Sequence, residues 1–124
     1  MESYLFVAIG GVFGTVTRYW LGGLLSEKWP VAFPIGTLVI NVTGAFLLGF
    51  LTSAGAEQGL ISQPWRLAFG VGFLGAYTTF STWQVETLRL LQQGSIWLGI
   101  GNVAASLTLG LLAAWLGYWL GRAL

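Results

Sequence analysis

The side chains that could do chemistry in this sequence are neutral hydrogen-bonding groups within long apolar stretches. Thr37 and Asn41 are four residues apart, so on a helix they would share one face. Asn102 and Ser106 repeat this spacing nearer the C-terminus. A polar group inside an apolar span must find a partner or face a cavity, so both pairs are candidates for lining a site. Simple hydrogen bonds between helices remain an open alternative for each residue.

The groups that most often serve catalysis or metal binding are missing. The sequence has no cysteine and no histidine, which excludes disulfides, thiolate nucleophiles and the usual metal ligand and triad base. Glu86 is the only carboxylate that could serve a proton-coupled pump, and it lies near the end of its predicted helix. No two carboxylates share a helix face within a predicted span. We therefore do not expect an enzyme.

One stretch has an unusual composition for a membrane helix. Three glycines between Gly70 and Gly75 precede a run of Thr and Ser, and the aromatic residues Phe80 and Trp83 lie three apart. Because Gly and Thr are poor helix formers, we predict a break near Gly75–Thr79. A break at membrane depth frees backbone carbonyls, which suit a hard cation such as sodium. A merely kinked helix is the alternative.

Composition indicates which elements position these residues. Hydrophobic residues make up 56% of the 124 residues and charged residues only 7%, against about 25% charged in soluble domains. This excludes a soluble globular protein, a disordered chain and a nucleic-acid binder. The long uncharged stretches predict an all-α membrane protein, one domain over residues 1–124, with four transmembrane helices near residues 3–25, 33–55, 65–91 and 95–121.

The charges give little instruction about orientation. With four spans, Arg66 and Arg122 lie on one side of the membrane, and Arg18, Lys28 and Arg89 on the other. Because the two sides carry nearly equal numbers of basic residues, the positive-inside rule does not select an orientation. The counts are either too small to be informative or typical of dual topology, in which the chain inserts both ways and pairs as an antiparallel homodimer. Because four helices bury little volume, we expect an oligomer.

Three motifs in matching order resemble those of one family, the CrcB/Fluc fluoride channels. They are the glycine-rich segment GGVFGTVTRY at residues 10–19, GTLVINVTGAF at 36–46 and GAYTTFST at 75–82. Together with the length and the four-span layout, the resemblance covers essentially the whole chain.

The resemblance implies a fluoride-selective channel that exports fluoride passively across the bacterial plasma membrane. It also implies an antiparallel dual-topology homodimer with two fluoride pores and a structural sodium ion at the dimer centre. The backbone carbonyls of Gly75 and Thr78 would hold that sodium ion.

The resemblance further implies a fluoride pathway. Asn41 would donate to fluoride, Phe80 would present its positive ring edge, and Ser106 matches a pore-facing hydroxyl. Three positions depart from the family pattern: Trp83 stands where a second phenylalanine is usual, and Asn102 and Gly110 stand where some members have a tyrosine and a hydroxyl residue. Additional pathway donors would be Thr37, Ser81 and Thr82, and structural or vestibule roles would fall to Arg18 and Glu86.

Two rival classes remain. A small dual-topology multidrug or cation transporter has a similar length, but its mechanism needs a carboxylate inside the first helix. Here that helix carries Arg18 and no acid after Glu2. A non-transporting accessory subunit would use the polar residues only for packing. Anion flux from liposomes separates the three.

Overall fold

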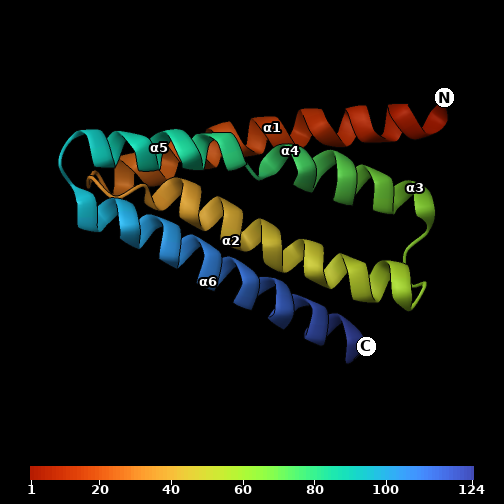
Figure 1. Ribbon diagram of the computed structural model, residues 1–124. Coiled ribbons are helices and arrows are strands. Elements are labelled where there is room, and N and C mark those ends of the chain that lie inside the picture. The colour runs from red at the N-terminus through yellow and green to blue at the C-terminus, as the bar shows by residue number, and fades with distance from the viewer.

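The computed structural model describes residues 1–124 and is entirely helical (Figure 1). Its elements, in chain order, are α1 (Glu2–Lys28), α2 (Ile35–Phe50), the π-helix η1 (Leu51–Glu57), α3 (Gln63–Arg66), the π-helix η2 (Leu67–Leu74), α4 (Gly75–Tyr77), α5 (Phe80–Gln92) and α6 (Ile96–Arg122).

Three helices are long and apolar enough to cross a membrane: α1, the continuous α2–η1 helix, and α6. They contain 27, 23 and 27 residues, against the roughly 20 that a span needs. The third predicted helix is instead two pieces, because α3, η2 and α4 form one rod and α5, of 13 residues, forms another. The chain is therefore a helical membrane protein in which one membrane-depth element is discontinuous.

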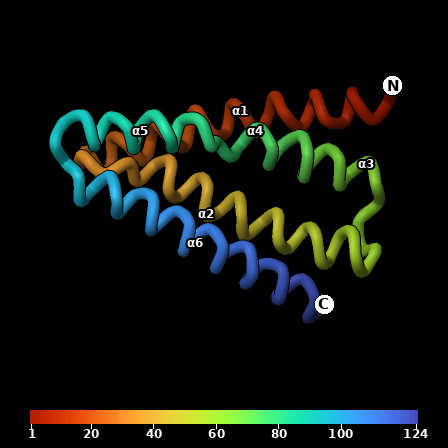
Figure 2. The backbone as a smooth tube through the Cα atoms, in the orientation of Figure 1, coloured from red at the N-terminus to blue at the C-terminus, as the bar shows by residue number.

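The elements pack as two long pairs. The α2–η1 helix lies along α6, and η2 lies along α1; α5 packs against the first part of α6 (Figure 2). The N- and C-termini lie at the same end of the molecule, and the α1–α2 and α5–α6 connections at the other (Figure 1). Glycines bring the paired helices together: an added Cβ at Gly14 would collide with the backbone of Phe73, and one at Gly117 with the backbone of Phe46.

The predicted break is confirmed, and it falls at Thr78 and Thr79. Both residues are extended, with φ −80° and ψ 153° at Thr78 and φ −146° and ψ 113° at Thr79. Thr79 then caps the next helix, because its Oγ1 accepts the Thr82 N–H at 3.3 Å. The chain thus ends one short helix and starts another within two residues.

The two π-helices were not predicted. A π-turn closes i→i+5 hydrogen bonds, and neither hydropathy nor glycine spacing carries a signal for that choice. η2 buries Gly70 and Gly72. Gly72 faces the backbone of Val7 in α1. The widened helix therefore lies where two backbones approach closely.

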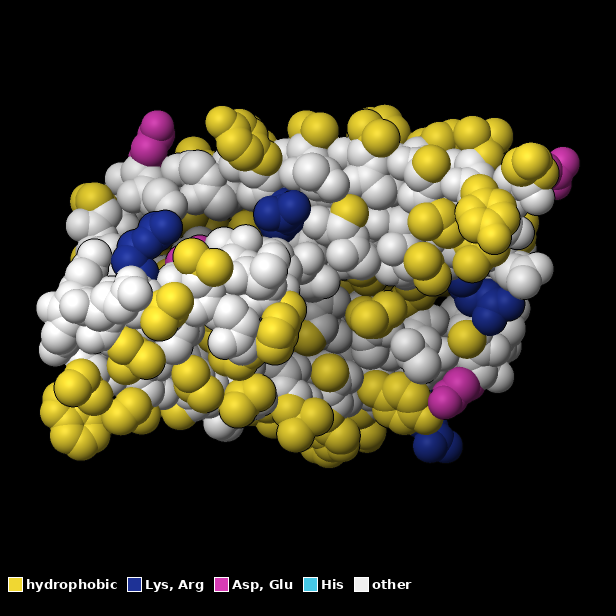
Figure 3. All heavy atoms as spheres, turned by 45° about the horizontal axis from the view of Figure 1, so that its top comes forward, with side chains coloured by type: hydrophobic (Ala, Val, Ile, Leu, Met, Phe, Trp, Pro, Cys, Tyr) yellow, Lys and Arg dark blue, Asp and Glu magenta, His cyan; other side chains and the backbone are white.

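A single copy of the chain has little interior. Only 20 of 124 residues are buried, so most apolar side chains lie on the surface. Figure 3 shows these side chains spread over the visible face, with few charged groups among them. Such a surface suits contact with lipid or with another protein rather than with water.

Candidate functional site

The helix break is held open by one side chain from α2. Asn41 Nδ2 donates to the Thr79 carbonyl at 3.0 Å, and the Thr79 N–H donates to Asn41 Oδ1 at 2.8 Å. Both backbone groups of an extended residue at membrane depth are thereby satisfied, as an apolar environment demands. An amide nitrogen carries two hydrogens, so one Asn41 N–H remains for another acceptor.

The break leaves carbonyls without their helical donors. In a continuous helix the Thr79 N–H would donate to Gly75, but here it donates to Asn41. The Thr82 N–H, which would serve Thr78, donates to Thr79 Oγ1 instead. The carbonyls of Gly75 and Thr78 therefore remain available to a ligand, and oxygen atoms of this kind suit a hard cation.

Of the two carbonyls between Gly75 and Thr78, that of Ala76 is occupied. Arg18 Nε donates to the Ala76 carbonyl at 3.0 Å. This places a guanidinium at the C-terminal end of α4, where the helix dipole is negative. Arg18, from α1, thus satisfies one of the backbone carbonyls at the break.

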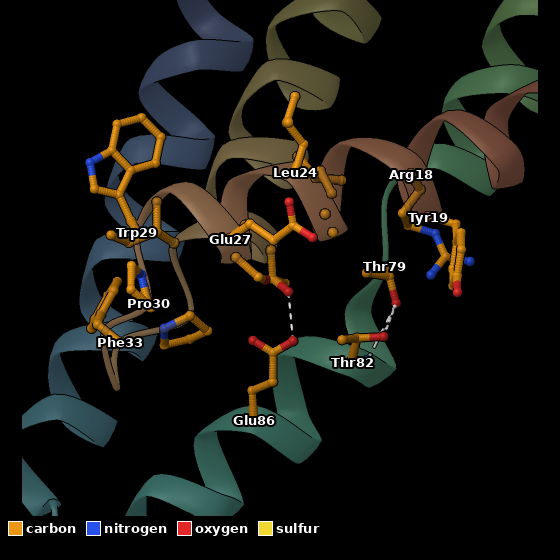
Figure 4. A pocket seen from close by; sticks show the side chains of 18 of the residues that line it. Arg18, Tyr19, Leu24, Glu27, Trp29, Pro30, Phe33, Thr79, Thr82 and Glu86 are labelled. Carbon is orange, nitrogen blue, oxygen red and sulfur yellow. Dashed lines mark hydrogen bonds between the residues drawn. The ribbon is translucent and has the colours of Figure 1, made fainter.

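Beside the break lies an open cavity of about 720 Å³ (Figure 4). Its walls come from the C-terminal half of α1, the α1–α2 connection, the start of α2, and α5. The polar side chains in the wall include Arg18, Thr37, Thr82 and Glu86. Thr37 Oγ1 donates to Glu86 Oε1 at 2.6 Å, so that carboxylate is tied to α2. Four of the predicted site residues therefore share one cavity.

A smaller hollow of about 280 Å³ continues along α5. Ser81, Thr82 and Glu86 line it together with Arg89. Ser81 is exposed there. Thr82 and Glu86 belong to both hollows, so they join the cavity to the outer face of α5.

The two aromatic residues of the motif form an edge-to-face pair. The ring centroids of Phe80 and Trp83 are 5.5 Å apart, and their planes make an angle of 70°. Phe80 is 70% exposed, whereas Trp83 is buried. Phe80 therefore presents its ring to whatever covers this face, with Trp83 behind it.

The second predicted polar pair lies against a different face of α5 from the one that lines the cavity. Asn102 Nδ2 donates to Thr87 Oγ1 at 2.8 Å, and the Trp83 indole Nε1 donates to the Asn102 carbonyl at 3.3 Å. Asn102 Oδ1 and Ser106 Oγ are buried without a hydrogen-bond partner. The predicted residues thus fall into three groups, one at the cavity, one between α5 and α6, and one at the break itself, where Asn41, Gly75 and Thr78 lie outside the cavity wall.

Sequence reasoning gave no role to three residues that the structure places at these groups. Thr79 partners Asn41, and Thr87 joins Trp83 to Asn102. Tyr77 shares a hydrogen bond of 2.9 Å with Thr43 beneath the break. Thr87 lies four residues after Trp83, and this spacing was the one available signal.

These features define a class: a small helical membrane protein with a broken helix and a polar, hydrogen-bonding site at the break. Comparison with known proteins makes this specific. Residues 5–118 match the model of the family described as CrcB-like protein, Camphor Resistance (CrcB). The chain belongs to this CrcB family.

Several relatives cover nearly the whole chain. A protein of Symbiobacterium thermophilum named fluoride-specific ion channel FluC 2 is 49% identical over 111 residues, 90% of either chain. A fluoride-specific ion channel FluC of Acidobacterium capsulatum is 48% identical over 121 residues, 97% of this chain and 96% of its own. One from Solibacter usitatus is 44% identical over 120 residues, 97% of this chain and 98% of its own.

Proposed function

We propose that this protein is a fluoride-selective channel through which fluoride leaves the cytoplasm passively. The observation that carries the proposal is its similarity, over 90% or more of its length, to relatives named as fluoride-specific channels. The chemistry of the site agrees. Fluoride only accepts hydrogen bonds, and the site offers neutral donors that can bind an anion without trapping it.

Each residue of the site would have a different role toward fluoride along the pathway. Arg18 places a positive charge in the wall of the cavity, which also carries the carboxylates of Glu27 and Glu86. Thr82 offers a hydroxyl, and the free N–H of Asn41 lies one turn of α2 beyond Thr37. The exposed ring of Phe80 offers a positive edge, which stabilises an anion where few water molecules surround it. In the wall of the cavity, the Glu86 carboxylate accepts the hydrogen bond of Thr37.

A second copy of the chain, inserted the other way, would complete the channel. The exposed aromatic residues and the small interior of one copy support an oligomer. The nearly balanced basic residues support dual topology. Gly75 supports close contact at the break, because it is exposed and an added Cβ would meet no atom closer than 3.9 Å.

A sodium ion would fit between two such breaks. Gly75 and Thr78 would each supply a carbonyl from either copy, and a hard monovalent cation accepts oxygen ligands of this type. When bound, the ion would hold the two breaks together and add positive potential near the pathway. Asn41 would keep the carbonyls in place by fixing Thr79.

Flux from liposomes tests the proposed function. Purified protein is reconstituted in liposomes loaded with potassium fluoride, and efflux is started with valinomycin and followed with a fluoride electrode. We expect rapid fluoride efflux without a proton gradient and little chloride efflux in matched vesicles. Proton-coupled uptake of an organic cation would favour the multidrug transporter, and absence of any flux would favour an accessory subunit. Either result would overturn the proposal.

A further inference from the structure

Two of the positions at which the chain departs from the family pattern, Trp83 and Asn102, are hydrogen-bonded to one another. The indole N–H of Trp83 donates to the backbone carbonyl of Asn102 at 3.3 Å. The Asn102 side chain donates to Thr87 Oγ1 at 2.8 Å, and Thr87 Oγ1 donates to the Trp83 carbonyl at 2.8 Å. Three residues therefore form a closed ring of hydrogen bonds that joins α5 to α6.

This ring determines how the Asn102 amide points. A threonine hydroxyl has one hydrogen, and that of Thr87 is used on the Trp83 carbonyl. Thr87 can then only accept from Asn102, so the amide nitrogen faces Thr87 and Oδ1 faces away. Asn102 is only 1% exposed, and its Oδ1 has no partner. A buried amide oxygen without a donor is costly, which indicates that a donor binds there.

Ser106 lies one turn further along α6, and it also lacks a partner. Five other hydroxyls in this protein donate to the carbonyl four residues before them, those of Thr43, Thr52, Ser53, Thr78 and Thr87. For Ser106 that carbonyl belongs to Asn102, and the Trp83 indole already occupies it. The Ser106 hydroxyl is therefore left with a hydrogen to donate.

We propose that Trp83 is a positioning residue for the fluoride pathway, because its indole N–H occupies the Asn102 carbonyl and keeps the Ser106 hydroxyl free to bind fluoride. Asn102 Oδ1 would hold a water molecule that stays with the ion. This inference rests on the proposed function.

The chemistry of fluoride supports a mixed site of this kind. The ion cannot bind an amide oxygen directly, because both are acceptors. A water molecule can donate one hydrogen to Asn102 Oδ1 and the other to fluoride, and Ser106 can donate to the ion from the next turn. Fluoride would thus keep part of its hydration while it moves along α6.

A double-mutant cycle in the liposome assay tests the positioning role. We expect Ser106→Ala to lower fluoride flux about tenfold, as removal of a donor to a charged acceptor should. Trp83→Phe keeps an aromatic ring but lacks the N–H, so Ser106 can turn back to the Asn102 carbonyl, and we expect a similar loss. The double variant should conduct no less than either single variant, because both changes remove the same free hydroxyl.

Two further variants separate positioning from packing. Trp97→Phe is the matched control, because Trp97 is 83% exposed on the same α6, and we expect normal flux. Asn102→Leu removes the side chain but leaves the backbone carbonyl, so flux should fall while the coupling between Trp83 and Ser106 persists. Multiplied losses in the Trp83 and Ser106 double variant would overturn the inference, as would normal flux in Ser106→Ala. A wild-type protein without fluoride flux would instead overturn the proposed function.

Discussion

Asn41 and Thr79, 38 residues apart, form a reciprocal amide pair in which the side chain of one satisfies both backbone groups of the other. The pair takes the place of the helical hydrogen bonds that Thr79 would otherwise make. It thereby stabilises an extended residue between α4 and α5, and it leaves carbonyls on the neighbouring residues free.

Loss of the Asn41 pair should therefore affect both stability and conduction. We expect Asn41→Leu, which removes both hydrogen bonds at similar size, to lower the free energy of unfolding by about 2–4 kcal/mol. Asn41→Asp keeps the acceptor for the Thr79 N–H but places a carboxylate against its carbonyl, so it should lower stability at least as much and abolish fluoride flux. Thermal unfolding in detergent and liposome efflux measure these effects. Thr52→Val is the control, because Thr52 is exposed and bonds only within the continuous α2–η1 helix. Unchanged stability in Asn41→Leu would contradict the prediction.

Close helix packing predicts that the effect of a glycine-to-alanine substitution in α1 on the unfolding temperature depends strongly on its position. Gly14→Ala would drive a Cβ into the backbone of Phe73, whereas a Cβ added at Gly23 would meet no atom of another element within 4 Å. We expect Gly14→Ala to lower the unfolding temperature clearly. Gly23→Ala should leave it unchanged or raise it slightly, since alanine is the better helix former by about 1 kcal/mol. Equal effects of the two substitutions would show that α1 does not lie against η2 in this way.

Arg18 should matter through its bond to Ala76 as well as through its charge. Arg18→Gln removes the positive charge at the end of α4, and we expect it to lower the free energy of unfolding by about 1–2 kcal/mol. Arg18→Lys keeps the charge, so its effect should be smaller. Arg89→Gln serves as the control, because Arg89 is exposed on α5. If Arg18→Lys and Arg18→Gln are equally harmful, the guanidinium geometry and not the charge is what the break requires.

Sodium should stabilise the protein through the carbonyls of Gly75 and Thr78. We expect the unfolding temperature in detergent to rise when N-methylglucamine is replaced by sodium at constant ionic strength. In Asn41→Leu the carbonyls lose their support, so the sodium-dependent rise should disappear. A rise of equal size with any monovalent salt would contradict a specific site.

Dual topology predicts labelling from both sides of a membrane. The chain has no cysteine, so a single one can be introduced at Gln93, in the exposed connection between α5 and α6. A membrane-impermeant maleimide should label about half of the protein in intact spheroplasts and the remainder only after lysis. A second variant, Ser62→Cys at the opposite end of the molecule, should give the same division. Complete labelling at one position and none at the other would establish a single orientation.

The amino-acid sequence alone determined that this protein lies in a membrane, and it predicted where one of its helices breaks. Nine charged residues cannot cover a soluble fold, so the long uncharged stretches had to be membrane helices. Glycines and threonines between Gly70 and Thr79 predicted a break, because local propensity acts within a few residues. The three motifs indicated the family and most of the candidate site residues.

Only the tertiary structure decided what those residues contact. It assigned Asn41 to Thr79, Thr37 to Glu86, and Trp83 to Asn102. It also placed the break at Thr78–Thr79 and introduced two π-helices. The physical reason is that a hydrogen bond between distant residues depends on how whole helices rotate and approach one another. That geometry is set by packing at positions such as Gly14 and Gly117, and spacing within one helix carries no information about it.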